Sequence, residues 1–165
     1  MASTTSNKAV FLDRDGTINN NSDYYVYSPD RFVFNPGVVE TLAELTKRGY
    51  RLFIISNQSG IGKNLYSIKD VEKVHDFMKS ELLKSCIEIT CIMYCTHHPD
   101  SGKCLCRKPE SLLFEKTIHR FTIDPKQSYM VGDSPRDIDA GKKAGLKGIL
   151  IEANSDLRQI LKKIK

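Results

Sequence analysis

The sequence lacks a long hydrophobic run, an internal repeat, a low-complexity tract and a recognisable domain linker. No apolar stretch approaches the roughly 18 residues that would cross a bilayer, so no membrane partner is expected. The composition is 40% hydrophobic and 27% charged, with 10 glycines and 6 prolines, which argues against disorder and collagen. For a chain of 165 residues, these features predict one globular domain spanning residues 1–165.

The N-terminal segment, residues 1–8, is polar and lacks the apolar centre of a signal peptide. We therefore expect a cytoplasmic protein. Nothing points to an oxidising compartment, so disulfide bonds are not expected among the 5 cysteines. All of the cysteines lie between Cys86 and Cys106, and cysteines scattered through a core would not cluster in this way.

The formal net charge of +5 suits an anionic ligand, such as phosphate, nucleic acid or a membrane surface. Part of the excess lies near the C-terminus, where Leu157, Ile160, Leu161 and Ile164 recur at helical spacing among basic residues. This pattern predicts an amphipathic helix over about residues 155–164, with its lysines in solvent. A patch that binds nucleic acid or lipid is the alternative.

Strand-like and helix-like segments alternate along the chain. Strands are expected at 9–12, 51–55, 87–94, 128–131 and 148–151. Helices are expected from Val38 to Gly49, from a Ser67 cap to Lys84, and over 110–119 and 135–144. Such alternation predicts a parallel sheet with helices on both faces, and ligands that bind beyond the carboxyl ends of the strands.

Two carboxylates follow the first predicted strand, in the sequence D-R-D-G-T at residues 13–17. Asp13 and Asp15 could share a divalent cation, or divide the roles of nucleophile and acid–base catalyst. Taken alone, a D-x-D pair is more simply a solvated turn.

The second and fourth predicted strands also end in polar motifs. Residues 56–60, S-N-Q-S-G, offer a hydroxyl and backbone N–H groups that can hold phosphate oxygens. Asp133 and Ser134 precede a predicted helix and could simply cap it. Lys108, before Pro109, adds a cation between these strands.

Read in order, the motifs are hydrophobic-D-R-D-G-T, I-S-N-Q-S-G, R-K-P and V-G-D-S-x-x-D. Over about residues 8–153 the chain closely resembles the haloacid dehalogenase (HAD) superfamily of phosphatases. The resemblance implies an α/β fold, a Rossmann-like three-layer sandwich with about five or six parallel strands. The interval from Ser56 to Lys108 has no room for a large cap domain, so we expect an open site.

The resemblance implies a role for each motif residue. Asp13 would attack phosphorus, and Asp15 would protonate the leaving oxygen and later deprotonate water. Mg²⁺, a hard cation, would be held by the Asp13 carboxylate, the Asp15 backbone carbonyl and Asp133. Phosphoryl oxygens would be bound by Ser56, the Asn57 backbone and Lys108. Supporting positions are Thr17, Ser134 and Asp137, with Asp137 expected to orient Lys108 or Ser134 rather than to bind metal.

A cluster of metal-ligand types precedes the R-K-P motif. Cys95 and His97 are followed by Cys104 and Cys106, which together supply three thiolates and one imidazole, a closed tetrahedral zinc set. Free structural thiols are the alternative. Four protein ligands leave no position for water, so the zinc would be structural and would brace the loop that ends at Arg107 and Lys108.

Physical reasoning alone leaves the choice between His97 and His98 open, and the resemblance favours His97. We expect Cys86 and Cys91 in the core. We expect His75 and His119 to be surface or satisfied core residues rather than ligands.

The sequence C-x-H-H-P…C-x-C-R-K-P narrows the resemblance to the D-glycero-D-manno-heptose-1,7-bisphosphate 7-phosphatases and the related histidinol-phosphate phosphatases. N-Q-S-G-I at residues 57–61 favours the heptose group. Arg107 would then contact the sugar or its second phosphate. Two positions depart from that group. Ser134 occupies a position where the group typically has lysine, and Lys63-Asn64 occupies one where it often has R-G. Both departures concern the identity of the substrate rather than the chemistry.

The expected partner is a small phosphorylated sugar, bound by a monomer. Histidinol phosphate is the alternative substrate. A non-enzymatic zinc module that binds nucleic acid is a further alternative, but the strand-end acids would repel phosphate unless metal is bound, and aromatic and basic residues do not interleave around the cysteines. A 3′-end nucleic-acid phosphatase would use the same chemistry. The aromatic loop 17–35, with Tyr24, Tyr25, Tyr27 and Phe32, either faces substrate or covers the core.

Overall fold

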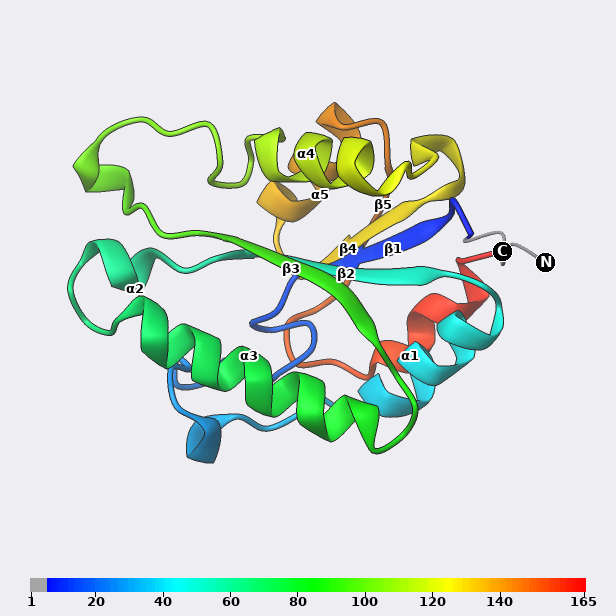
Figure 1. Cartoon of the computed structure of the whole chain (residues 1–165), viewed down its shortest axis with the longest axis horizontal. Coiled ribbons are helices and arrows are strands. Elements are labelled where there is room, and N and C mark those ends of the chain that lie inside the picture. The colour runs from blue at the N-terminus through cyan, green and yellow to red at the C-terminus, as the bar shows by residue number, and fades with distance from the viewer. Residues whose placement is uncertain (1–5) are drawn as a thin grey trace.

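The computed structural model describes residues 6–165, and a five-stranded parallel sheet forms its centre (Figure 1). The strands are β1 (Ala9–Leu12), β2 (Arg51–Asn57), β3 (Ile89–Cys95), β4 (Tyr129–Gly132) and β5 (Lys147–Leu150). Their order is β3-β2-β1-β4-β5, so β1 lies in the middle. The prediction for residues 1–8 falls mostly outside the described residues.

Helices cover both faces of the sheet. They are α1 (Val38–Lys47), α2 (Ser59–Gly62), α3 (Ile68–Leu83), α4 (Leu112–Phe121) and α5 (Pro135–Lys143). In Figure 1, α4 and α5 lie above the sheet and α1 and α3 below it. This is the expected three-layer sandwich, and the described chain contains no large cap.

The side chains of β1 divide between two hydrophobic cores. Val10 and Leu12 belong to the core shared with α1 and α3, whereas Ala9 and Phe11 belong to the core shared with α4 and α5. All four are fully buried, as expected of a parallel strand covered on both faces. This double burial fixes the position of the residue that follows the strand, Asp13.

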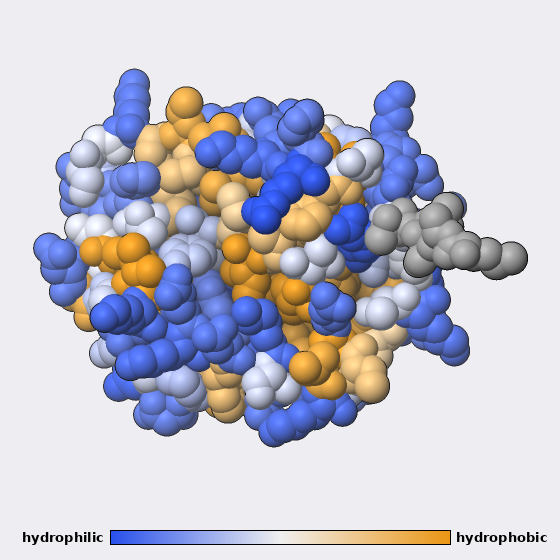
Figure 2. Space-filling view, viewed as in Figure 1, coloured by the Kyte–Doolittle hydropathy of each residue, from blue (hydrophilic) through white to orange (hydrophobic). Residues whose placement is uncertain are grey.

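Strand β3 lies at an edge, where no other strand of the described chain pairs with its outer side. Its middle residues are only partly buried. Figure 2 shows hydrophobic side chains at the surface in the middle of this face, where β3 runs.

The region between α3 and β3 departs from expectation. Ser67 caps α3 as predicted, and it forms a reciprocal pair of hydrogen bonds with Asp70. However, α3 ends at Leu83, and Cys86 follows in a left-handed turn (φ 57°) where it is exposed. The prediction that Cys86 is a core residue is therefore wrong. Cys91 is partly buried against the core under α4.

The C-terminal segment forms a 3₁₀ helix, Leu157–Lys162, instead of the amphipathic α-helix predicted over 155–164. Its apolar side chains do pack on α1. Arg48 donates to the carbonyls of Leu161 and Ile164, both at 2.9 Å, and the Tyr50 hydroxyl donates to the carbonyl of Lys165. These contacts satisfy carbonyls at the end of the chain, which have no partner within a helix.

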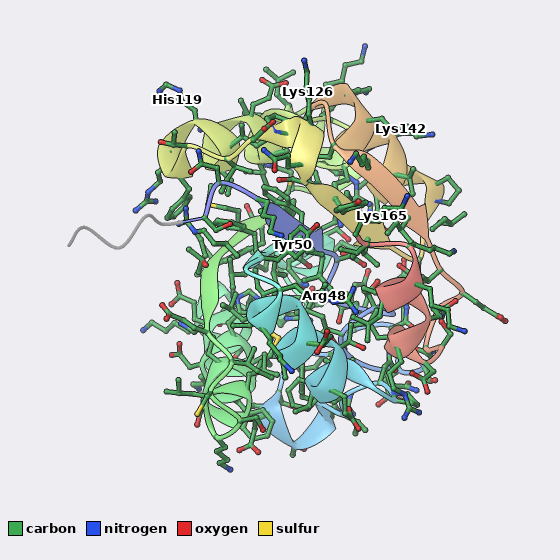
Figure 3. The ribbon with its side chains drawn as sticks, turned by 90° about the vertical axis from the view of Figure 1, so that its right-hand side faces the viewer. Arg48, Tyr50, His119, Lys126, Lys142 and Lys165 are labelled. Carbon is green, nitrogen blue, oxygen red and sulfur yellow. The ribbon has the colours of Figure 1, made fainter. Side chains whose placement is uncertain are left out.

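Figure 3 shows this end of the molecule, at the amino ends of the strands, with Lys126, Lys142 and Lys165 around it. Part of the excess positive charge therefore lies opposite the carboxyl ends of the strands. None of the helices in residues 6–165 combines the length and apolarity needed to cross a bilayer.

Candidate active site

The motif residues meet at the carboxyl ends of β1, β2 and β4, around a cavity. Its lining includes Asp13, Asp15, Gln58, Arg107, Lys108 and Asp133. The three strands are neighbours in the sheet, so segments far apart in sequence converge here. This is the position expected for a ligand in a parallel α/β fold.

Lys108 is buried at the base of this cavity and uses all three of its ammonium hydrogens. Its Nζ lies 2.6 Å from Asp13 Oδ1, 2.7 Å from Asp137 Oδ1 and 2.8 Å from the carbonyl of Ile55. Burial alone would lower the pKa of Lys108, but the charges of Asp13 and Asp137 outweigh it and raise that pKa. The lysine is therefore a fixed positive charge, and a phosphoryl oxygen that reaches it must replace one of these acceptors.

The acidic side chains beside Lys108 are a fit for a hard divalent cation. Burial raises the pKa of Asp13 well above its ordinary value, and burial and the charge of Asp137 raise that of Asp133. Oxygens of Asp13, Asp133 and Asp137 lie within 4.8 Å of one another. Asp137 already binds Lys108 and accepts from the Ser134 N–H at 3.0 Å. Both oxygens of Asp137 therefore have partners, whereas Asp13 contacts Lys108 through Oδ1 only. Asp13 and Asp133 are thus the better fit for Mg²⁺, whose preferred ligands are oxygens.

Gly16 allows β4 to approach the loop after β1. A Cβ at this position would lie 2.3 Å from Asp133 Oδ2, and the backbone has φ of 85°. No other residue adopts that conformation and leaves that space without strain. The glycine of D-R-D-G-T therefore lets Asp133 reach Asp13.

Asp15 is held by side chains that the motif analysis did not assign. Its Oδ1 accepts from Arg14 Nη2 at 2.9 Å and from Asn19 Nδ2 at 3.0 Å, and its Oδ2 accepts from Gln58 Nε2 at 2.9 Å. An arginine between two aspartates would be expected in solvent, yet Arg14 is fully buried. Only the fold reveals these partners, because they come from three different loop positions.

His75 on α3 lies behind Arg14. Its Nε2 is 3.3 Å from Arg14 Nη1, and burial together with the neighbouring guanidinium lowers the pKa of His75 to about 3. The imidazole is therefore neutral near pH 7, and Nε2 accepts the Arg14 hydrogen. His75 is a satisfied core residue, as expected, and His119 on α4 is exposed.

The end of β2 is tied to the R-K-P segment. Ser56 is buried, and its Oγ accepts from Gln58 at 2.8 Å. The Asn57 side chain donates to the carbonyl of Lys108 at 3.2 Å and accepts from its N–H at 3.0 Å. The sequence suggested a role for the Asn57 backbone, whereas the structure shows that its side chain positions Lys108.

Arg107 lines the cavity, and its Nη1 is buried without a hydrogen-bond partner among the described residues. An unpaired guanidinium nitrogen facing such a site suits an anionic or hydroxyl-rich ligand.

The aromatic loop 17–35 divides between the cavity and the core. Tyr24 and Tyr25 line the cavity, and Tyr27 stacks on Tyr66 with ring centroids 5.1 Å apart. Phe32 is instead buried in the core beside α3. Thr17 is fully buried and does not line the cavity.

The predicted zinc ligands come together after β3. Cys95 Sγ lies 3.1 Å from Cys106 Sγ and 3.7 Å from Cys104 Sγ, and His97 Nδ1 lies 3.2 Å from Cys106 Sγ. Ligand atoms around a tetrahedral zinc are about 3.5–3.8 Å apart, so the cluster is close to the size needed. His98 Nδ1 instead accepts from the Asp100 N–H at 3.1 Å. The geometry thus brings His97, not His98, to the sulfurs.

The thiols of this cysteine cluster differ in their electrostatics. Burial and the neighbouring Cys106 thiol raise the pKa of Cys95 to about 12. Burial has the same effect on Cys104, but the N–H of Arg107 and the Cys95 thiol outweigh it and lower the pKa of Cys104. A metal ion is the partner that stabilises buried thiolates.

Fold and site together define a HAD-type hydrolase, and comparisons with known proteins agree. A family model for HAD-hydrolase-like proteins matches residues 105–165. The D-glycero-beta-D-manno-heptose-1,7-bisphosphate 7-phosphatase of Haemophilus influenzae is 37% identical, with 96% of this chain and 99% of that protein aligned. The enzyme of the same name from Helicobacter pylori is also 37% identical, over 93% of this chain and 88% of the relative.

A solved structure is similar over nearly the whole chain. It is the D,D-heptose 1,7-bisphosphate phosphatase from B. bronchiseptica complexed with magnesium and phosphate, which is 33% identical with a TM-score of 0.83. The match covers 94% of this chain and 86% of that one. The chain therefore belongs to the D-glycero-D-manno-heptose-1,7-bisphosphate 7-phosphatase family of HAD-type phosphatases.

Proposed function

We propose that this protein is a Mg²⁺-dependent phosphatase that removes the 7-phosphate of D-glycero-D-manno-heptose 1,7-bisphosphate. The observation that supports it most is the buried contact of Asp13 with Lys108, with Asp133 beside them. Phosphoryl transfer depends on positioning and on neutralised charge, and this group offers a nucleophile, a cation and metal ligands together. The activity named for the aligned relatives supports the substrate.

In the first step, an Asp13 oxygen forms a bond to phosphorus as the bond from phosphorus to the sugar oxygen breaks. The sugar oxygen takes the proton from Asp15. Water then attacks the aspartyl-phosphate and gives a proton to Asp15, which releases phosphate and restores the Asp13 carboxylate. When bound, Mg²⁺ would be held by Asp13, Asp133 and the Asp15 carbonyl, and it would offset repulsion between the nucleophile and the phosphate.

The remaining residues would bind the substrate. We expect the reacting phosphoryl group to be bound by Ser56, the Asn57 backbone and Lys108. Asn57 and Lys108 line the cavity, whereas Ser56 is buried and does not line it. The unpaired Nη1 of Arg107 supports a contact with the sugar or its second phosphate. Ser134 caps α5 and Asp137 holds Lys108, so we expect both to support the site rather than to react.

We also propose that Cys95, His97, Cys104 and Cys106 hold a structural zinc ion. Its four protein ligands would leave no coordination position for water, so it would take no part in hydrolysis. Its role would be to fix the loop that leads into Arg107 and Lys108. We further propose a single domain that acts as a cytoplasmic monomer on a small phosphorylated sugar, without nucleic acid or membrane.

The test is a comparison of kcat/KM for the α and β anomers of heptose 1,7-bisphosphate and for histidinol phosphate, with Mg²⁺ present. We expect one heptose anomer to be the best substrate and chelation of Mg²⁺ to abolish turnover. Preference for histidinol phosphate would establish the alternative substrate. Equal and poor turnover of both would exclude both.

A further inference from the structure

Gln58 lies between the two halves of the proposed site. Its Nε2 donates to Asp15 Oδ2 at 2.9 Å and to Ser56 Oγ at 2.8 Å, and its Oε1 accepts from the Tyr66 hydroxyl at 2.9 Å. The residue is buried, with 2% of its surface exposed. An ionised carboxylate only accepts hydrogen bonds, so the amide nitrogen must face Asp15 and the amide cannot flip.

The two carboxylate oxygens of Asp15 accept different numbers of hydrogen bonds. Oδ1 accepts from Arg14 Nη2 at 2.9 Å, from Arg14 Nε at 3.3 Å and from Asn19 Nδ2 at 3.0 Å. Among residues 6–165, Oδ2 accepts from Gln58 alone. Each carboxylate oxygen has two lone pairs, so Oδ1 is saturated whereas Oδ2 keeps one lone pair free.

From this asymmetry we infer that Gln58 is a positioning residue for the proposed reaction. It holds Asp15 so that Oδ2 is the oxygen that exchanges the proton. That proton passes from Oδ2 to the leaving oxygen as its bond to phosphorus breaks and the bond from Asp13 forms. In the second step, a water proton returns to Oδ2. This inference rests on the proposed phosphatase function.

The hydrogen bond from Gln58 to Ser56 connects the proposed proton donor with a proposed phosphoryl-binding residue. Ser56 is proposed to bind the phosphoryl group, and Asp15 to reach the oxygen that leaves it. One amide therefore fixes the spacing between phosphorus and proton donor. Such spacing matters because a displacement of about 1 Å can lower a rate on the order of 10²-fold.

The inference makes a prediction about leaving groups. An alkyl phosphate, such as a sugar phosphate, needs a proton on its departing oxygen, whereas nitrophenolate leaves without one. Gln58→Met has a similar size but no amide hydrogens. We expect it to lower kcat/KM for an alkyl phosphate on the order of 10²-fold, and to lower kcat/KM for nitrophenyl phosphate less than about threefold.

Ser56→Ala is the matched comparison, since the phosphoryl group is common to both substrates. It should lower kcat/KM for both esters, in contrast to the selective loss expected of the Gln58 variants. Gln58→Asn, whose side chain is one methylene too short for its amide to reach Asp15, serves as a second variant if Gln58→Met does not fold. It should give the same selective loss.

The outcomes separate this inference from the function on which it rests. If the wild-type protein hydrolyses both esters and the Gln58 variants lower both equally, the role of Gln58 is wrong while the phosphatase function stands. If the wild-type protein with Mg²⁺ hydrolyses neither ester, the proposed function fails and the inference fails with it.

Discussion

The aspartate site after β1 and the cysteine cluster after β3 both gather ionisable side chains, yet they are held in different ways. Asp13 and Asp15 are positioned by protein partners, namely Lys108, Arg14, Asn19 and Gln58. In the cysteine cluster, the sulfur atoms and His97 contact mainly one another. The first site is organised by the fold itself, whereas in the second the proposed zinc ion would stabilise the thiolates.

The sharpest test of the aspartate site is Asp13→Asn. An amide of nearly the same shape keeps the packing but is a poor nucleophile, so kcat should fall at least on the order of 10⁴-fold. The measurement is phosphate release under saturating substrate and Mg²⁺. Asp139→Asn, an exposed change on α5, is the control and should retain full activity. Activity near the wild-type level in the Asp13 variant would refute the assigned nucleophile.

The cysteine cluster should respond in stability rather than in chemistry. Cys106→Ser removes a proposed zinc ligand, so the protein should lose its zinc and about 4 kcal/mol of unfolding free energy. Elemental analysis and chemical denaturation measure these two effects. Cys86→Ser changes the exposed cysteine outside the cluster, and its zinc content should be unchanged. Equal zinc in both variants would contradict the proposed ligand set.

The buried His75, which contacts Arg14 behind Asp15, predicts a pH dependence of the unfolding free energy. The pKa of His75 is about 3 in the folded protein, below the ordinary value of 6.5, so its stabilising effect is complete above pH 6.5 and is lost as the pH falls toward 3. His75 should contribute up to about 1.4 kcal/mol per pH unit to the slope of the unfolding free energy against pH. His75→Gln should flatten the loss of stability between pH 6.5 and 4 in denaturation experiments. His119→Gln, on an exposed residue, should leave the slope as it is, and an identical slope in both variants would argue against this role for His75.

A smaller effect is expected where the two regions touch. Gly62 ends α2, and a Cβ there would lie 2.7 Å from the His98 nitrogen and 3.0 Å from the Thr96 carbonyl oxygen. Gly62→Ala should therefore push α2 and the cysteine loop apart and lower stability by about 1–3 kcal/mol. Thermal unfolding measures the change, with exposed Lys63→Ala as the control. Unchanged stability would contradict the prediction, because it would mean that the cysteine loop moves away from the added methyl group at no cost.

The sequence predicts most of the fold, because its signals are local. Apolar runs bounded by Pro36, Gly49 and Gly145 predict the alternation of strands and helices, and Ser67 predicts the start of α3. The prediction of an α-helix in the C-terminal segment is wrong because helical spacing of apolar residues does not distinguish an α-helix from a shorter 3₁₀ helix. In the folded chain the last carbonyls are instead bound by Arg48 and Tyr50, which lie in the turn between α1 and β2.

The sequence likewise predicts some residues of the candidate site and not others. The residues whose type limits their chemistry, such as Asp13, Lys108 and Cys95, can be proposed from the sequence. Arg14 and Gln58 cannot, because arginine and glutamine in loops are ordinary surface residues until the fold buries them. What makes them part of the site is the set of acceptors that neighbouring strands bring to them.

The central position of β1 also bears on how this protein could change during evolution. Strands β2 and β4 flank it, while β3 and β5 form the margins of the sheet. New segments could be added after β5 without shifting the strand that leads to Asp13, whereas the segment after β3 carries Lys108 and is constrained by its contact with Asp13. The architecture therefore separates a part that must be preserved from parts that are free to diversify, and a new substrate preference could arise by replacing peripheral loops alone.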